Sequence, residues 1–276
     1  MRRPILPPGD AAHEFEEHYT EGRIGEVRFL STTAMEGIGA RFGILVVLIL
    51  PSPHVIHGQQ RPSVSALLRQ FEGERVFWRQ FEVAKAIVAA NDKSVLPELE
   101  SWLTSEDRHL RGNAAFIFAG LGDPRGFDVI VDILGDRSEK RKVDKISPVG
   151  TPSEQGQIRE DRYYAAHLLG DLKDPRAIPI LVPLLTDPEV NYIVPWSLGQ
   201  IGNRSAIKPL IGSLSDPNPS IRVLAIYALV ELKATEALPR LRQLLDDNAR
   251  SNFDKFESVA EAAQAAIGKL QSEAAR

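Results

Sequence analysis

A short motif returns along this chain at intervals of roughly thirty residues, and it restricts the possible folds more than any other feature. The stretch 164–187, YAAHLLGDLKDPRAIPILVPLLTD, shows the motif in full. Its glycine and its closing aspartate have counterparts at matched places: Gly170, Gly199, Val230 and Gly268 for the first, Asp187, Asp216 and Asp247 for the second. A fixed period of this length is typical of stacked helical hairpins, in which each repeat packs only on its neighbours.

Each repeat is predicted to hold two helices, because apolar residues recur at i, i+3, i+4 and i+7 in paired stretches. The expected first helices centre on 82–90, 113–121, 164–172, 193–201, 224–232 and 262–270. The expected second helices cover 94–103, 126–134, 177–185, 206–214 and 237–245. The predicted fold is therefore all-α, a right-handed α-solenoid of five to six hairpins over residues 62–274, with the helix 257–270 as its terminal cap.

Prolines and aspartates punctuate these helices in a regular way. Asp123-Pro124 and Asp174-Pro175 each place an N-cap carboxylate just before a proline at the first helical position. Pro195 departs from the pattern, because it falls inside an expected first helix, where a proline predicts a bend.

The repeated pattern AAxxLGxLxDPRAIPxLxxLLxD resembles the HEAT-like repeat of the short subclass named after phycobilisome lyases, over about residues 77–270. The resemblance implies an armadillo-like α-solenoid. Deoxyhypusine hydroxylase is similar in repeat type and holds a di-iron centre through His-Glu pairs ahead of the paired alanines. The matched places here hold Tyr163-Tyr164, Gly112-Asn113, Tyr192-Ile193 and Val223-Leu224. Because a metal needs several converging imidazole and carboxylate ligands, we expect neither a metal nor another cofactor.

Composition and motifs narrow the possible functions further. The net charge of −4 argues against a nucleic-acid partner, which needs a concentrated basic surface. The absence of cysteine removes thiolate metal sites and cysteine nucleophiles. The sequence also contains no HExxH motif, nucleophile elbow or glycine-rich phosphate loop. The chain is thus predicted not to be an enzyme, although activity of the bilin lyase kind stays open.

Residues 42–50, FGILVVLIL, form the one long apolar run of the chain. As a helix they would cover about 14 Å, less than half of the ~30 Å hydrocarbon core, so no stable membrane span is expected. An apolar stretch followed by a polar, proline-containing segment favours a signal peptide over 35–58, with translation starting at Met35. Residues 1–34 would then be a disordered leader or a misassigned start. The alternative is an ordinary helix of a cytoplasmic protein.

Residues 137–160 interrupt the array without any apolar periodicity. A segment of this length without structure is either a functional loop or a flexible linker. Its first half is basic, with Arg137, Lys140, Arg141, Lys142 and Lys145. We expect a flexible insertion between two repeats.

The most suggestive candidate site is an aromatic column along the first helices. The position after the paired alanines holds Phe116, His167, Trp196 and Tyr227, and Tyr163 and Tyr192 stand one turn earlier. Stacked repeats would align these six side chains on the concave face, where aromatic groups with polar tips favour protein binding. The alternative is that the rings fill gaps between helices. Three matched arginines, Arg111, Arg162 and Arg222, are expected to pair with acidic residues of neighbouring repeats.

The leading hypothesis from the sequence is an exported, non-catalytic scaffold that binds a protein or peptide in the groove of its solenoid. A bilin-lyase-like accessory enzyme or subunit is the main alternative. A cytoplasmic scaffold is the third possibility, if the apolar run is not a signal.

Overall fold

The computed structural model describes residues 62–138, 154–252 and 258–274, and all of them belong to one compact unit. The described part of the chain contains twelve α-helices joined by turns, with no strand. This confirms the predicted all-α repeat architecture. The predicted leader 1–34 and signal peptide 35–58 lie outside the described residues, as does most of the insertion.

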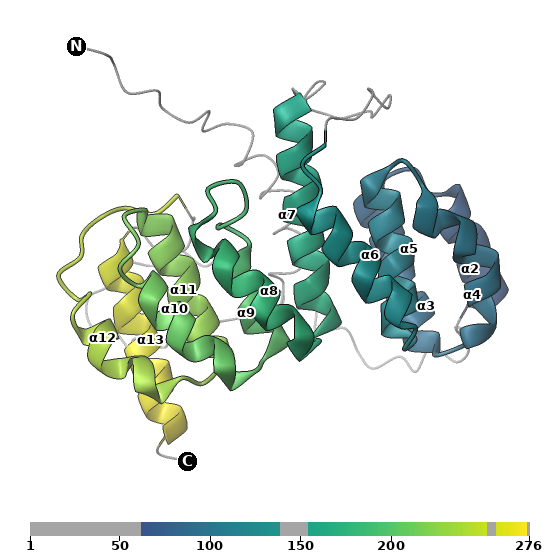
Figure 1. The fold of residues 1–276 in the computed structure, drawn as a ribbon. Helices are drawn as coiled ribbons and strands as arrows, with labels where there is room; N and C mark the ends of the chain where they lie inside the picture. The colour runs from purple at the N-terminus through teal and green to yellow at the C-terminus, as the bar shows by residue number, and fades with distance from the viewer. Residues whose placement is uncertain (1–61, 139–153, 253–257, 275–276) are drawn as a thin grey trace, which may run out of the picture. The chain divides into compact units, whose positions relative to one another are not determined.

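The first helices of successive repeats pack side by side and form one layer (Figure 1). They are α3 (Phe77–Ala90), α5 (Arg108–Gly120), α7 (Glu154–Leu172), α9 (Val194–Ile201), α11 (Pro219–Glu231) and α13 (Val259–Ala274). A further helix, α2 (Val64–Gly73), precedes them and packs on α3. The helix α13 buries one apolar side against α11 and α12, as expected of a terminal cap.

The second elements of the repeats form the other layer, and most of them are short helices flanked by 3₁₀ turns. The helices are α4 (Leu96–Leu99), α6 (Pro124–Gly135), α8 (Ile178–Leu181), α10 (Ile207–Ser213) and α12 (Leu238–Arg242). The 3₁₀ turns are η2 (Lys93–Val95), η3 (Glu100–Thr104), η4 (Pro175–Ala177), η5 (Val182–Thr186), η6 (Arg204–Ala206) and η7 (Thr235–Ala237).

Proline explains why one second helix is long and the others are short. In the third repeat Pro179 and Pro183 remove two backbone donors, so η4, α8 and η5 replace a single helix. The matched places in the second repeat hold Asp128 and Asp132, and α6 accordingly runs for 12 residues. The sequence pattern had predicted the positions of these elements but not their division into α and 3₁₀ turns.

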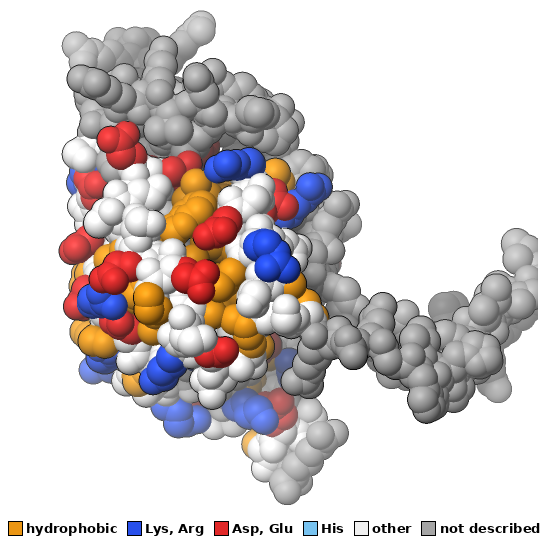
Figure 2. All heavy atoms as spheres, turned by 90° about the vertical axis from the view of Figure 1, so that its right-hand side faces the viewer, with side chains coloured by type: hydrophobic (Ala, Val, Ile, Leu, Met, Phe, Trp, Pro, Cys, Tyr) orange, Lys and Arg blue, Asp and Glu red, His pale blue; other side chains and the backbone are white. Residues whose placement is uncertain are grey.

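Alanine and leucine side chains from both layers fill the space between them. Ala165, Leu169, Leu181 and Ile130 are all fully buried. The two large apolar side chains that are exposed within the described part are Trp78 and Leu245. At the face around the first repeat, hydrophobic side chains lie among acidic and basic ones (Figure 2).

The first helices end in a left-handed residue at five matched positions. These residues, with their φ angles, are Asn91 at 54°, Gly122 at 85°, Lys173 at 55°, Gly202 at 73° and Lys233 at 51°. Glycine adopts this conformation readily, whereas a residue with a Cβ is strained in it. Two lysines therefore stand where the backbone favours glycine.

We expect Lys173→Gly to raise the free energy of unfolding by about 0.5–1 kcal/mol, because it relieves the strain at the end of α7. The gain is smaller than the strain itself, since glycine also increases the entropy of the unfolded chain. Urea denaturation followed by circular dichroism measures the change. The matched control, Gly202→Ala, introduces a Cβ at the same place in the next repeat and should lower stability; a gain there would contradict the explanation.

Pro195 corrects one prediction. It does not bend a helix, because α9 begins at Val194 and Pro195 lies in its first turn. A proline is tolerated there, since backbone N–H groups of the first turn have no partner within the helix. The residues ahead of it form turns, so α9 is short rather than bent.

The insertion also needs a correction. Residues 137–160 were expected to lack regular structure, but α7 already starts at Glu154. Ile158 is buried, and Asp161 just beyond it makes an ion pair with Arg108, so tertiary contacts fix these added turns. Arg137 and Ser138, at the other end of the insertion, are also held by ion pairs and hydrogen bonds.

Length and apolarity together decide whether a helix could cross a bilayer, and none of the described helices meets both conditions.

Candidate functional site

The six side chains of the predicted aromatic column lie on first helices or just before them, and two of the six are buried. Phe116 is 5% exposed and His167 is 3% exposed. Phe116 packs edge-on against Phe81 with the ring centroids 4.9 Å apart, and His167 contacts the same ring at 5.8 Å. His167 also stacks on Trp196 at 4.4 Å. Rings from four neighbouring first helices therefore form a packed series, which fits the gap-filling alternative for these two positions.

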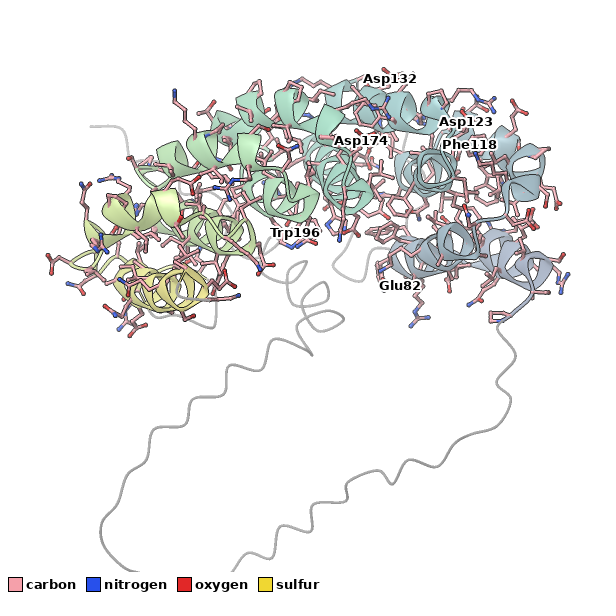
Figure 3. All side chains as sticks on the ribbon, turned by 90° about the horizontal axis from the view of Figure 1, so that it is seen from below. Glu82, Phe118, Asp123, Asp132, Asp174 and Trp196 are labelled. Carbon is pink, nitrogen blue, oxygen red and sulfur yellow. The ribbon has the colours of Figure 1, made fainter. Side chains whose placement is uncertain are left out.

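The other four members are only partly buried: Tyr163, Tyr192, Trp196 and Tyr227. Trp196 projects from the first-helix layer on the side away from Asp132 of the second layer, as does Glu82 (Figure 3). Its indole lies over Gly170, where an added Cβ would come within 3.1 Å of the ring. These four side chains are within reach of a partner, and their role in binding stays a prediction.

Two of these tyrosines are further constrained by their surroundings. The Tyr192 hydroxyl accepts a hydrogen bond from Asn218 Nδ2 at 2.6 Å, which ties the turn before α9 to the turn before α11. Burial raises the pKa of Tyr227, so this phenol stays neutral.

The matched arginines tie successive repeats together. Arg162, only 2% exposed, donates from Nε to the carbonyl oxygen of Leu134 at 2.8 Å. Its guanidinium pairs with Asp187 at 2.7 Å and with Glu189. Burial opposes ionisation of Asp187, but hydrogen bonds from Arg162 and from the Glu189 amide hold its pKa below the usual value.

Arg222 repeats this arrangement two repeats later. Its guanidinium donates to the carbonyl oxygen of Asp216 at 2.7 Å and pairs with Asp247 at 2.9 Å. Arg111 makes the same kind of contact to a backbone carbonyl, because its guanidinium donates to the Ser105 carbonyl at 2.7 Å. The prediction of acidic partners is confirmed for Arg162 and Arg222, with one correction. Glu189, which pairs with Arg162, belongs to the following repeat as predicted, whereas Asp187 and Asp247 close the arginine's own repeat and the preceding repeat supplies a backbone carbonyl.

A second buried arginine, Arg108, joins the second repeat to the third. Its Nε donates to Asp136 at 3.0 Å, Nη1 to Asp161 at 3.1 Å, and Nη2 to the Ser138 carbonyl at 2.9 Å. His109 Nδ1 lies 3.4 Å from the same Asp161. Burial would raise the pKa of Asp136, but hydrogen bonds from Ser138 and Arg108 lower it to about 2.

A buried amide network occupies two of the places where the hydroxylase resemblance located metal ligands. Asn113 accepts a hydrogen bond from the Tyr164 hydroxyl and donates to Gln80 Oε1 at 2.8 Å. Gln80 in turn donates to the carbonyl oxygen of Phe71 at 3.0 Å. The network links α2, α3, α5 and α7. Within the described ranges no three His, Asp or Glu side chains are grouped closely enough to hold a metal ion.

The Asp-Pro-Arg corners on the second layer confirm the predicted N-caps and add a contact between repeats. Asp174 accepts from the backbone amide of Arg176 at 2.9 Å, and the Arg176 guanidinium returns to the same carboxylate. The guanidinium also lies 4.3 Å from the ring centre of Phe127 in the preceding repeat. Asp123 and Arg125 repeat the corner one repeat earlier. Both arginines are more than half exposed, so these pairs add little stability.

Sequence reasoning found the arginines and the aromatic residues because both recur at matched positions. It missed Arg108, which recurs as Arg159 in the third repeat, and it missed His109 and Asp161, whose matched places hold Glu160 and Leu110. Their only signal was charge at helix positions that face the neighbouring repeat.

Comparison with known protein families finds a repeat family whose paired helices agree with this geometry. A family model described as HEAT repeats matches residues 157–211 and 186–255. Residues 157–255 of the chain are HEAT repeats. The HEAT match covers the third to fifth repeats, where the aspartate-closed motif is most regular.

Relatives of this chain include two proteins named for bilin chemistry. The phycocyanobilin lyase subunit alpha of Synechococcus elongatus is 35% identical over an alignment of 124 residues, and the match covers 37% of this chain and 45% of that protein. The bilin biosynthesis protein PecE of Mastigocladus laminosus is 34% identical over 87 residues, 30% of this chain and 32% of the relative. The chain thus spans less than half the length of these curated relatives. A designed armadillo repeat protein is 17% identical in sequence. Its structural match covers 75% of this chain and 100% of the designed protein, with a TM-score of 0.40.

Proposed function

We propose that this chain is a binding subunit of a system that handles bilins, and that it holds a partner protein on the first-helix side of its array. The observation that carries the proposal is the local similarity to a lyase subunit and to a bilin biosynthesis protein. A subunit acts together with other chains, and HEAT arrays present extended surfaces to such chains.

The partly exposed aromatic side chains support a binding surface on this side. Trp196 and Tyr227 lie on neighbouring first helices, α9 and α11, and both keep part of their rings accessible. Tryptophan and tyrosine are enriched among the side chains that dominate binding energy, because they bury a large area at low entropy cost. Trp196 is also held rigidly, since it stacks on His167 and lies over Gly170.

We further propose that the chain contributes binding rather than bond formation, and that export by a signal peptide at 35–58 determines where it acts. A second candidate function is a scaffold for a protein or peptide without any bilin, supported by the general use of HEAT repeats in protein binding.

A titration with free phycocyanobilin tests the bilin part of the proposal. We expect a saturable change in bilin absorbance together with quenching of tryptophan fluorescence. The double variant Trp196→Ala/Tyr227→Ala should weaken the binding by roughly tenfold or more, as loss of a hot spot does. Trp78→Ala is the matched control, because Trp78 is exposed on α3, three first helices away.

The outcomes separate the two candidate functions. No absorbance change with the unaltered chain would remove the bilin part and leave the scaffold. A double variant that binds like the unaltered chain would show that the bilin binds elsewhere. Circular dichroism must show that both variants keep their helices, because Trp196 also packs between α7 and α9.

A further inference from the structure

Buried polar side chains are distributed unevenly along the array. Nine polar or charged side chains are buried in the described part of the chain, and six of them gather where α3, α5 and α7 meet. The six are Gln80, Arg108, His109, Asn113, Asp161 and Arg162. Of the other three, His167 lies further along α7, 3.6 Å from Asp171, and Ser197 and Ser220 lie on the later helices α9 and α11. The polar cluster lies at the boundary between the second and third repeats, the place where the insertion interrupts the array.

Charged contacts cross this boundary at two points. At the first, Arg108 of α5 pairs with Asp161 of α7, and both side chains are no more than 3% exposed. At the second, Arg162 of α7 donates to the Leu134 carbonyl at the end of α6. The Tyr164–Asn113 hydrogen bond crosses between them.

The charges that face these arginines come from every neighbouring element. Around Arg108 are Asp107, His109 and Arg111 of its own helix region, Asp136 after α6, and Asp161 of α7. Around Arg162 are Asp187 and Glu189 before α9, and these two carboxylates also bind the solvent-exposed Arg137. The arginines stay charged at any accessible pH, whereas the carboxylates do not.

The later boundaries rely more on close backbone packing, although Arg222 also donates across the last of them to the Asp216 carbonyl. Between α7 and α9, Gly170 lies against Ser197, whose hydroxyl donates to the Ala166 carbonyl at 2.9 Å. Between α9 and α11, Gly199 lies against Ala228, where an added Cβ would come within 3.1 Å of Cα. Close backbone packing of this kind does not depend on the protonation of carboxylates.

We propose that the boundary between the second and third repeats is an acid-sensitive joint, at which the array separates into two independently unfolding segments, residues 62–138 and 154–274. At low pH the carboxylates around Arg108 and Arg162 lose their charge, and the Arg108 guanidinium then stays buried at the boundary that its pair with Asp161 now spans. An unpaired buried charge strongly destabilises a packed boundary. The pKa values of Asp136 and Asp187 are lowered in the folded state. Their stabilisation is therefore complete above about pH 4 and is lost as the pH falls toward about 2.

Native-state hydrogen exchange of the full chain, measured by mass spectrometry in increasing urea, tests the joint. At about pH 7 we expect the free energy of opening to fall with urea in the same way for peptides from α3, α5 and α6 as for peptides from α9 and α11. At about pH 2 we expect two separate dependences, divided between α6 and α7. A single shared dependence at both pH values overturns the proposal, and so does a division at another boundary or a division already complete at neutral pH.

Two matched variants identify the groups responsible. Asp161→Asn removes the charge that Arg108 faces and keeps the side-chain size, so it should separate the two segments already at about pH 7. Asp247→Asn removes the partner of Arg222, within the fifth repeat, and should behave like the unaltered chain. If Asp161→Asn keeps one shared dependence at neutral pH, the buried charges do not hold the joint. The measurement on the unaltered chain remains decisive even if Asp161→Asn fails to fold.

Discussion

Replacing Arg162 by methionine is expected to lower the free energy of unfolding by about 3–5 kcal/mol, as breaking a buried ion pair from one side does. The guanidinium is 2% exposed and serves three acceptors: the Leu134 carbonyl, Asp187 and Glu189. Methionine fills much of the same volume, so the loss comes mainly from the acceptors that remain. For a chain of this size the melting temperature should fall by on the order of 10 °C.

Arg137→Met is the matched control for this prediction. Arg137 binds the same two carboxylates, with Nη2 2.9 Å from Asp187 and Nη1 2.7 Å from Glu189, but it is 57% exposed. Because solvent screens exposed pairs, its removal should change stability by less than about 1 kcal/mol. Urea denaturation of both variants compares the two sites. Equal losses would contradict the claim that burial, rather than pairing alone, decides the contribution.

Replacing Gly126 by alanine should also destabilise the chain, by at least about 1–3 kcal/mol, although alanine is the better helix former by about 1 kcal/mol. A Cβ on Gly126 would stand 2.2 Å from the Ala115 carbonyl oxygen and 2.3 Å from the Ala119 nitrogen. Both atoms are backbone, so no side chain can rotate away, and α6 would have to move off α5. The clash lowers the free energy of unfolding and the higher helix propensity of alanine raises it, so the sign of the measured change shows which effect is larger.

Gly135→Ala gives the control on the same helix. Nothing lies within 4 Å of a Cβ added at Gly135, at the far end of α6. Thermal unfolding should show Gly135→Ala unchanged or slightly stabilised and Gly126→Ala clearly less stable. If both variants gained stability, helix propensity would outweigh the close packing of α5 and α6.

The regular part of the fold could be predicted because the same residues return in each repeat. Apolar spacing placed all six first helices and all five second elements, and the Asp-Pro pairs placed the N-caps at Asp123 and Asp174. Position within a helix was harder to predict. Pro195 differs from a helix-bending proline only because α9 starts one residue earlier, and this start depends on the preceding turns.

The irregular features could not be predicted, since each depends on a contact between residues far apart in the sequence. The early start of α7 depends on Asp161 meeting Arg108, 53 positions earlier. The burial of Phe116 and His167 depends on Phe81, whose ring contacts both of theirs. Lys173 and Lys233 gave no signal of a left-handed backbone, because lysine is not a residue that usually marks one.

The matched arginines have a consequence for how such a chain can grow. Arg162 and Arg222 each take an acidic partner from the end of their own repeat, and from the preceding repeat they require only a main-chain carbonyl. Every repeat offers that carbonyl whatever its sequence. Recombination at the closing aspartate could therefore move a hairpin and keep its arginine paired with that aspartate, but the Arg108–Asp161 pair would be lost if the second and third repeats were separated. The fifth repeat, in which Arg222 pairs with its own closing Asp247, is therefore the best unit for building artificial arrays.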